Sequence, residues 1–149
     1  MAVGDSNLYD TDILLWSERQ ADLLRRHAAG ERVNDASIDW PNIVEEIEDV
    51  GRSELHSVES LLVQALRHRL KAEAWPLHRD AENWRADAID FRQQAQRRFA
   101  GSMRQRIDME RLYRHARRAL PQKMDGLPQL PLQAEMPTLD ELLAEPKGE

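Results

Sequence analysis

Carboxylates crowd one short stretch of the chain, and their spacing is the feature of the sequence closest to metal chemistry. Glu45, Glu46 and Asp49 lie almost side by side along it. If this stretch is helical, residues three or four apart share one face, where carboxylate oxygens can hold Mg²⁺ or Mn²⁺. The candidate metal ligands of the sequence are Glu45, Glu46, Asp49, Glu54 and Asp87.

One hypothesis for these carboxylates is a divalent-metal-dependent nucleotide hydrolase. Glu45-Glu46-x-x-Asp49 and Asp87-x-x-Asp90 are similar in outline to the paired acidic motifs with which all-α nucleotide pyrophosphatases hold Mg²⁺. The second motif has Asp where that family has Glu, and the interval between the motifs is too long. Such short motifs also arise by chance when 32% of the residues are charged. No catalytic residue is assigned, and the enzyme remains an alternative.

A second candidate surface is basic. Phosphate binding requires clustered positive charge on one face, and the predicted fourth helix carries several arginines. The aromatic residues before and within it are assigned to the core, which leaves no platform for stacking bases. Nucleic-acid binding is therefore a further alternative. Its candidate residues for an anionic partner are Arg104, Arg111, Arg114 and Arg118.

The acidic stretch must be positioned by a long helix, which we predict from about residue 41 to about residue 75. Pro41 suits a first helical turn, and Asp39 can cap it. Gly51 lies in the interior of this predicted helix, where glycine is less favourable than alanine by about 1 kcal/mol. Its two interpretations are close approach of a neighbouring element and a kink in the helix. The predicted apolar stripe comprises Ile43, Ile47, Val50, Val58, Leu61, Ala65 and Ala72.

Glu54 falls on the same stripe as these apolar residues. An ionised carboxylate needs a partner in such a place. We therefore predict that Glu54 is largely buried and bonded to an arginine, or to Trp or backbone N–H groups, from another helix.

The remaining helices are predicted from the helical spacing of apolar residues and from the capping residues, glycines and prolines that end each stretch. The first runs from the cap at 10–12 to Gly30, with Ile13, Trp16 and His27 facing inward, and follows a loose segment at 1–9. A third covers about 79–100 and a fourth runs from Gly101-Ser102 to Leu120. Residues 121–137 form a Pro-rich arm, and Thr138 caps a short last helix through Leu143. The aromatics predicted to be mostly buried are Trp16, Trp84, Phe91 and Phe99.

Several of these segments resemble one known family. Asp39-Trp40-x-Asn42-Ile43-x-Glu45-Glu46-Ile47-Glu48-Asp49-x-Gly51-Arg52-Ser53-Glu54 looks like the motif of the bacterial family called domain of unknown function 29. Leu8-Tyr9-Asp10-Thr11-Asp12, Trp16, Trp84-Arg85 and Pro137-Thr138-Leu139 resemble its other segments. The loop Gly30 to Ser37 and the Arg-rich fourth helix depart from the family pattern. The resemblance implies an all-α, cytoplasmic bacterial protein and passes on no catalytic residues.

Composition bounds the remaining possibilities. The chain of 149 residues is expected to be one domain, 1–149, with four main helices around the long central one. It has no cysteine, and it shows neither a membrane-length apolar run nor a signal peptide, so cytoplasmic is the expected location. Residues 1–54 carry net charge −8, residues 55–124 +7 and residues 125–149 −5. Pairing of these charges within the fold is the favoured interpretation.

By elimination, the sequence favours a non-catalytic helical bundle that acts in protein interaction. The predicted partner is another protein, with a homodimer as the alternative, and no membrane. No cofactor is predicted, with Mg²⁺ or Mn²⁺ as the alternative. There are three candidate partner surfaces: the acidic ridge of Glu45, Glu46, Glu48 and Asp49, the arginine face of Arg104, Arg111, Arg114 and Arg118, and the Pro-rich arm.

Overall fold

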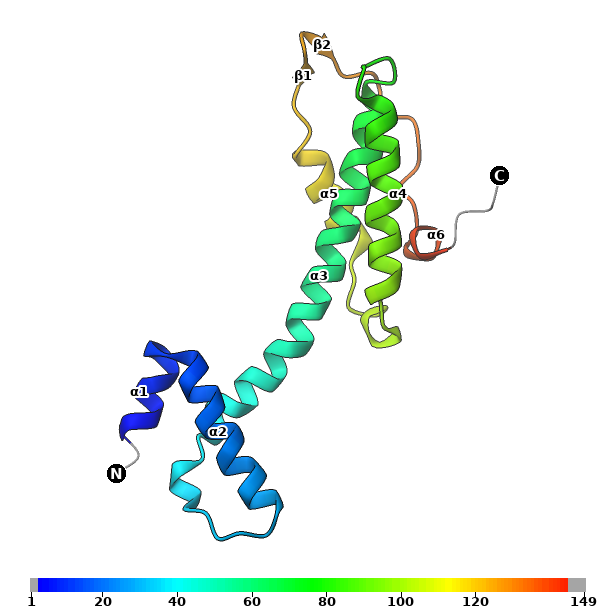
Figure 1. The fold of residues 1–149 in the computed structure, drawn as a ribbon. Coiled ribbons are helices and arrows are strands. Elements are labelled where there is room, and N and C mark those ends of the chain that lie inside the picture. The colour runs from blue at the N-terminus through cyan, green and yellow to red at the C-terminus, as the bar shows by residue number, and fades with distance from the viewer. Residues whose placement is uncertain (1–2, 145–149) are drawn as a thin grey trace. The chain divides into compact units, whose positions relative to one another are not determined.

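The structure, a computed structural model, describes residues 3–144, with side chains from residue 7 onward. Its elements are α1 (Val3–Thr11), α2 (Ile13–Ala28), η1 (Asp35–Ser37), α3 (Trp40–Ala74), α4 (Ala81–Arg98), η2 (Gly101–Met103), α5 (Met109–Arg118), β1 (Lys123–Met124), β2 (Leu127–Pro128) and α6 (Leu139–Leu143) (Figure 1). The predicted all-α class and the long helix are confirmed, and α3 differs from its predicted bounds by one residue at each end.

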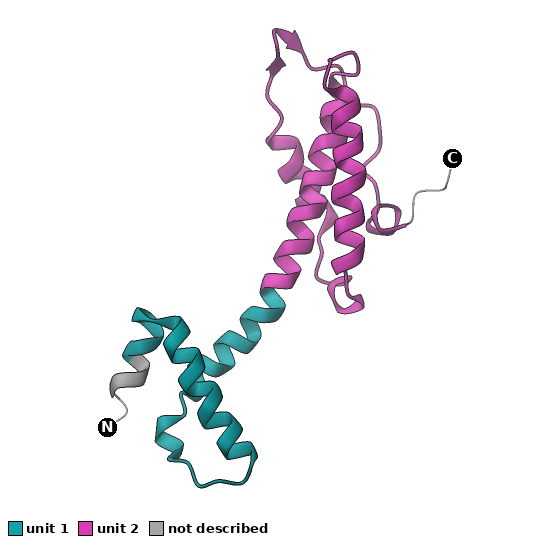
Figure 2. Ribbon diagram, viewed as in Figure 1, with its two compact units in different colours: residues 1–52 teal, residues 53–149 magenta. Residues whose placement is uncertain are grey.

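The chain forms two compact units, residues 1–52 and residues 53–149 (Figure 2). The helix α3 contributes residues 40–52 to the first unit and residues 53–74 to the second. Each unit has its own buried apolar cluster or clusters. The single domain stays a prediction, because two compact units that share a helix can unfold together or separately.

In the first unit, α2 and the segment before α3 are joined by buried polar contacts. Trp16 packs with Ile38 and Ile43 in the core. Gln20 is buried beside them, and its amide donates to the Ser37 carbonyl at 3.1 Å. Its amide oxygen accepts from the Asp39 N–H at 2.8 Å. One side chain thus satisfies two backbone groups and fixes where α3 begins.

Two predictions for this unit are wrong. The segment predicted to be loose at 1–9 is helical from Val3 onward, and residues 1–2 lie outside the described part. His27 and Ile13, predicted to face inward, are exposed. The reason is that α1, the segment before α3 and the start of α3 pack around Trp16 and bury Trp16 and Gln20, but they do not cover the two ends of α2. Gly30 closes α2 with φ +83°, as predicted.

The core of the second unit is built on the second half of α3. Val58, Leu62, Leu66 and Leu70 are all buried there. They pack against Ala95 of α4, against Leu112 and Ala116 of α5, against Leu120 just after α5, and against Leu139 and Leu142 of α6. Two apolar faces on this half of α3 explain why it is covered on more than one side.

The Pro-rich arm is not helical, as its composition predicts, and it returns along the end of α3. The Leu130 N–H donates to the Ala74 carbonyl at 3.0 Å. The indole of Trp75 donates to the Leu127 carbonyl at 2.9 Å. Within the arm, β1 and β2 pair as a small antiparallel hairpin around Asp125 and Gly126, both at positive φ. This hairpin was not predicted, although Asp-Gly is a strong turn pair.

The prediction of a fourth helix from Gly101-Ser102 onward is wrong for its first half. Residues 101–103 form a 3₁₀ turn, and α5 begins at Met109, after Asp108. The Asp108 carboxylate accepts from the Arg111 N–H at 3.2 Å, so this cap sets the start of the helix. Trp16 and Trp84 are buried as predicted, whereas Phe91 and Phe99 are partly buried. Thr138 caps α6 as predicted.

Candidate functional site

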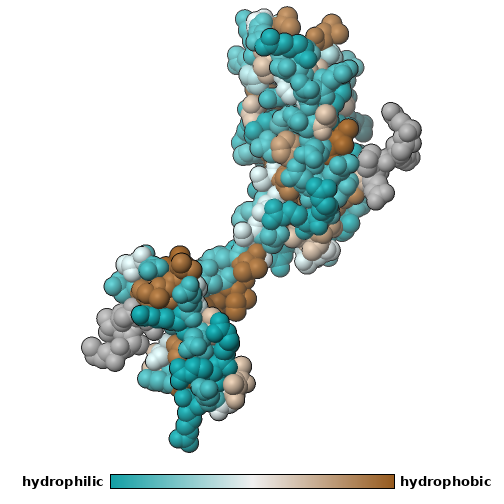
Figure 3. Space-filling view, viewed as in Figure 1, coloured by the Kyte–Doolittle hydropathy of each residue, from teal (hydrophilic) through white to brown (hydrophobic). Residues whose placement is uncertain are grey.

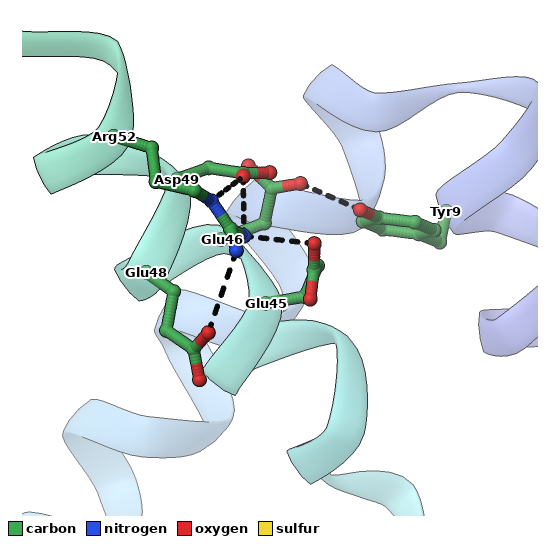
Figure 4. Close-up of polar contacts among 6 residues, drawn as sticks. All are labelled: Tyr9, Glu45, Glu46, Glu48, Asp49 and Arg52. Atoms are coloured by element: carbon green, nitrogen blue, oxygen red, sulfur yellow. Dashed lines mark hydrogen bonds and ion pairs between the residues drawn. The ribbon is translucent and has the colours of Figure 1, made fainter.

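The acidic ridge, defined as Glu45, Glu46, Glu48 and Asp49, lies on the part of α3 in the first unit. Arg52 reaches back along the helix to three of these carboxylates (Figure 4). Its Nη2 lies 2.9 Å from Glu45 Oε1 and 2.6 Å from Asp49 Oδ1. Its Nη1 lies 3.6 Å from Glu48 Oε2. The hydrogen bond to Asp49 is the main reason why the pKa of Arg52 is raised.

The fourth carboxylate of the ridge, Glu46, points toward α1. The Tyr9 hydroxyl donates to Glu46 Oε1 at 2.6 Å (Figure 4). This hydrogen bond is the largest cause that raises the pKa of Tyr9 from 10.0 to about 12, followed by burial and by the negative charge of Glu46. Tyr9 is therefore a persistent hydrogen-bond donor and not a nucleophile at neutral pH.

Two of the sequence segments that resemble the known family, the N-terminal one at residues 8–16 and the first part of the motif that begins at Asp39, meet in this unit. Tyr9 packs edge to face on Trp16, with ring centroids 4.9 Å apart. The Trp16 indole donates to Asp39 Oδ2 at 3.0 Å. Each aromatic of the N-terminal segment thus bonds one carboxylate of the α3 motif, Glu46 or Asp39. These motif residues have a structural role, which is to dock α1 and α2 on α3.

The structure gives each predicted metal ligand a partner other than a metal. Glu45 and Asp49 hold Arg52, and Glu46 holds Tyr9. Asp87 Oδ2 lies 3.9 Å from His68 Nε2. Within residues 3–144, no three His, Cys, Asp or Glu side chains are arranged to bind a metal ion. The metal site stays a prediction, and protein contacts already account for these carboxylates.

Glu54 was predicted to be buried and paired with an arginine from another helix. The pairing is confirmed, because Arg98 Nη2 of α4 lies 2.9 Å from Glu54 Oε1. The burial is wrong, since about half of the Glu54 side chain is exposed. The buried carboxylate of this region is Glu59, which pairs with Arg111 and was not predicted. Fully buried positions of α3 in the second unit begin only at Val58.

The predicted arginine face is divided by the structure. Arg104 precedes α5 and pairs with Asp140, while Arg111 pairs with Glu59. Arg114 and Arg118 are exposed on α5. The two engaged arginines support the interpretation that opposite charges pair inside the fold. They leave a smaller basic surface for an anionic partner than the sequence suggested.

The first unit also carries an exposed apolar face, which was not predicted from the sequence. Val44 is 50% exposed, and Ile47 and Val50 are each 68% exposed. Ile47 and Val50 were assigned to the core stripe, and that assignment is wrong. Apolar surface covers this part of α3 in the space-filling view (Figure 3). We call Val44, Ile47, Val50 and Gly51 the exposed face of α3.

A sequence signal for this exposed face existed. The first half of the predicted helix has one narrow apolar stripe among four carboxylates, whereas the second half has a further apolar face in Leu62, Leu66 and Leu70. A single stripe can be covered by one neighbour only. In the first unit, Ile43 is buried against Trp16 and Ile38. Ile47 and Val50, further along the same stripe, remain exposed.

The class of protein that the fold defines is an all-α protein. Comparison with known proteins then gives the family. Residues 8–146 match the family described as domain of unknown function DUF29, and the chain belongs to that family. An α-helical protein of unknown function from Rhodospirillum rubrum is similar in structure, with 31% identity and a TM-score of 0.55. The match covers 92% of this chain and 89% of that chain.

No curated protein matches the chain. Among the residues described, no helix is long and apolar enough to cross a membrane. Because neither the family nor the similar structure has an assigned activity, a function has to be argued from the surfaces of this chain.

Proposed function

We propose that the protein is a non-catalytic interaction module. In this proposal, the exposed face of α3 binds an amphipathic, basic helix of another protein. The observation that carries the proposal is the 68% exposure of both Ile47 and Val50, three residues apart on one helix. Single exposed apolar residues are ordinary on proteins, but several aliphatic side chains gathered on one helical face mark an interaction surface.

Gly51 supports a helix as the occupant. It continues the exposed face one turn beyond Ile47, and a Cβ built at this position would meet nothing within 4 Å. Packing inside this chain therefore does not require glycine there. Glycine in a helix interior is unfavourable by about 1 kcal/mol relative to alanine, and it lets a second helix approach the backbone closely. Close approach of a partner helix would therefore explain why glycine stands at position 51.

The charge around the exposed face supports a basic partner. Four carboxylates and one arginine lie in residues 44–52. Arg52 bonds three of these carboxylates, yet the segment keeps a negative balance. Basic residues along the edge of a partner helix would complement this rim and would speed association at low salt. A second copy of the chain that used the same face would bring two acidic ridges together, which disfavours the homodimer.

The test is a binding titration with a synthetic helical peptide of about five turns, leucine on one face and lysine on its flanks. We expect binding to wild type and a loss of at least about tenfold in affinity for Ile47→Asp, because a buried aliphatic side chain contributes about 1.5–3 kcal/mol. Leu77→Asp is the matched control, since Leu77 is 96% exposed and lies in the second unit.

Three results would overturn the proposal. A peptide with glutamate in place of lysine could bind equally well, which would remove the charge argument. Leu77→Asp could lose as much affinity as Ile47→Asp, which would mean that any exposed apolar residue is used. Light scattering could show a wild-type dimer that Ile47→Asp dissociates, which would identify a second copy as the occupant.

A further inference from the structure

A groove of about 740 Å³ lies in the second unit, among α3, α4, the Pro-rich arm and α6. Its volume is in the range of about 300–1,000 Å³ that is typical of small-molecule sites. The apolar part of its lining comes from Ala65, Ala72, Pro76, Ala88, Ile89, Ala134 and Leu142. Small side chains line the helices here, and they leave room that larger residues would fill.

The charged part of the lining is strongly unbalanced. Arg69, Arg85 and Arg92 line the groove, and the one carboxylate in the lining is Glu73. The Glu73 carboxylate accepts the backbone N–H groups of Gln133 and Ala134, at 2.9 and 2.8 Å. It is thereby turned to the arm and holds it in place. No ion pair joins Glu73 to an arginine of the groove in the described residues.

The three arginines differ in what they already bind. Arg92 donates to the carbonyl oxygens of Glu141, Leu142 and Ala144 at 2.7–2.8 Å, so its role is to dock α6. Arg69 and Arg85 have no hydrogen-bond or ion-pair partner within the part of the chain that the structure describes. They come from α3 and α4, respectively. Two guanidinium groups without carboxylate partners thus flank an apolar groove.

We infer that this groove binds an organic anion with an apolar tail, of the alkyl carboxylate class. The carboxylate would be held by Arg69 and Arg85, whose forked N–H donors suit two-point contact with a carboxylate. The alkyl chain would lie over Ala65, Ala72, Ala88 and Ile89. Because Ala65 and Ala72 are already buried, the apolar surface removed from water is that of the chain itself, of Ala88 and of Ile89. Ile89 is 48% exposed without a ligand, and such a chain would cover it.

The experiment is calorimetric titration of the full chain with octanoate, decanoate and dodecanoate below their micelle concentrations. We expect affinity to rise by up to about fourfold per added methylene, the equivalent of the transfer free energy of one buried CH₂. Decyltrimethylammonium, which has a similar tail and the opposite charge, should not bind. A cation that binds as tightly as decanoate would overturn the inference, and so would the absence of decanoate binding.

Variants locate the site. Arg85→Gln and Arg69→Gln should each weaken decanoate binding by about fivefold, the upper range for an exposed ion pair. Arg114→Gln removes an exposed arginine of α5 outside the groove and should bind as wild type does. Equal losses in Arg114→Gln and Arg85→Gln would overturn the inference. Ala88→Phe should abolish binding by filling the groove; if it fails to fold, the arginine variants decide.

This site is independent of the proposed partner surface. Ile47→Asp should bind decanoate as wild type does, because Ile47 lies in the first unit and does not line the groove. A loss of decanoate binding in Ile47→Asp would place the alkyl chain on the exposed face of α3 and would overturn the inference for the groove.

Discussion

At the scale of single residues, hydrogen bonding changes what a side chain can do. Tyr9 would ordinarily lose its proton near pH 10, but its bond to Glu46 raises its pKa to about 12. The folded state therefore holds this proton more tightly than the unfolded state. Stability from this proton is complete below pH 10 and is lost as the pH rises from 10 through 12.

The raised pKa of Tyr9 can be measured directly, because the chain has only two tyrosines. In Tyr113→Phe, the ultraviolet absorbance of tyrosinate should titrate with a midpoint near 12. In the double variant that adds Glu46→Gln, the midpoint should move back toward 10. A midpoint near 10 in Tyr113→Phe, with circular dichroism still that of the native helix, would show that the Tyr9–Glu46 bond is absent.

Two carboxylates of the second unit should contribute unequally to stability. Glu59 is buried and bonded to Arg111, so Glu59→Gln should cost about 1–3 kcal/mol, toward the lower end because Arg111 itself is exposed. Glu54 pairs with Arg98 at the surface, so Glu54→Gln should stay within about 1 kcal/mol of wild type. Urea unfolding curves measure both. A larger loss of stability for Glu54→Gln than for Glu59→Gln would contradict the assignment of Glu59 as buried and Glu54 as exposed.

At the scale of elements, local chemistry predicted most helix ends. Asp39 before Pro41, Gly30 after α2 and Thr138 before α6 all act where the sequence places them. Elements set by tertiary contacts were missed. The helix α1 is docked through the bond from Tyr9 to Glu46, which lies 37 residues further along the chain. A helical pattern alone does not reveal such partners from distant segments. The start of α5 was also missed, although its Asp108 cap is a local contact.

Gly51 offers a test at the scale of one helix. Because nothing lies within 4 Å of a Cβ at this position, Gly51→Ala should stabilise the isolated protein by about 1 kcal/mol. The same substitution should weaken binding of the basic helical peptide, since the added methyl group holds the partner away. Melting curves and peptide titrations give the two quantities. A stabilised variant with undiminished binding would remove Gly51 from the proposed contact.

At the scale of the whole chain, the two units differ in the size of their cores. The first unit has three buried apolar side chains in its cluster, Trp16, Ile38 and Ile43, whereas the second has two clusters with more members. Regions with few buried contacts open at lower free energy. In hydrogen exchange, amides of α2 should exchange faster than those of residues 58–70 in α3. Equal protection would mean that both units open together.

The sequence predicted the helical class and the charge segments, but it could not show which apolar residues remain uncovered. Ile43 and Ile47 lie four apart on one stripe, and only Ile43 is buried. The difference depends on how far α2 and its following loop extend over α3, which is a tertiary property. For the same reason, the sequence placed the buried carboxylate at Glu54 when it is Glu59.

The central claim is that the exposed face of α3 is the partner surface. The most direct measurement is a set of amide nuclear magnetic resonance spectra of the full chain, recorded while the basic helical peptide is added. The largest shifts should fall on residues 44–52, with little change at Arg114 or Arg118 and around the groove lined by Ala88. Shifts concentrated on α5 or on the groove, with residues 44–52 unmoved, would contradict the claim.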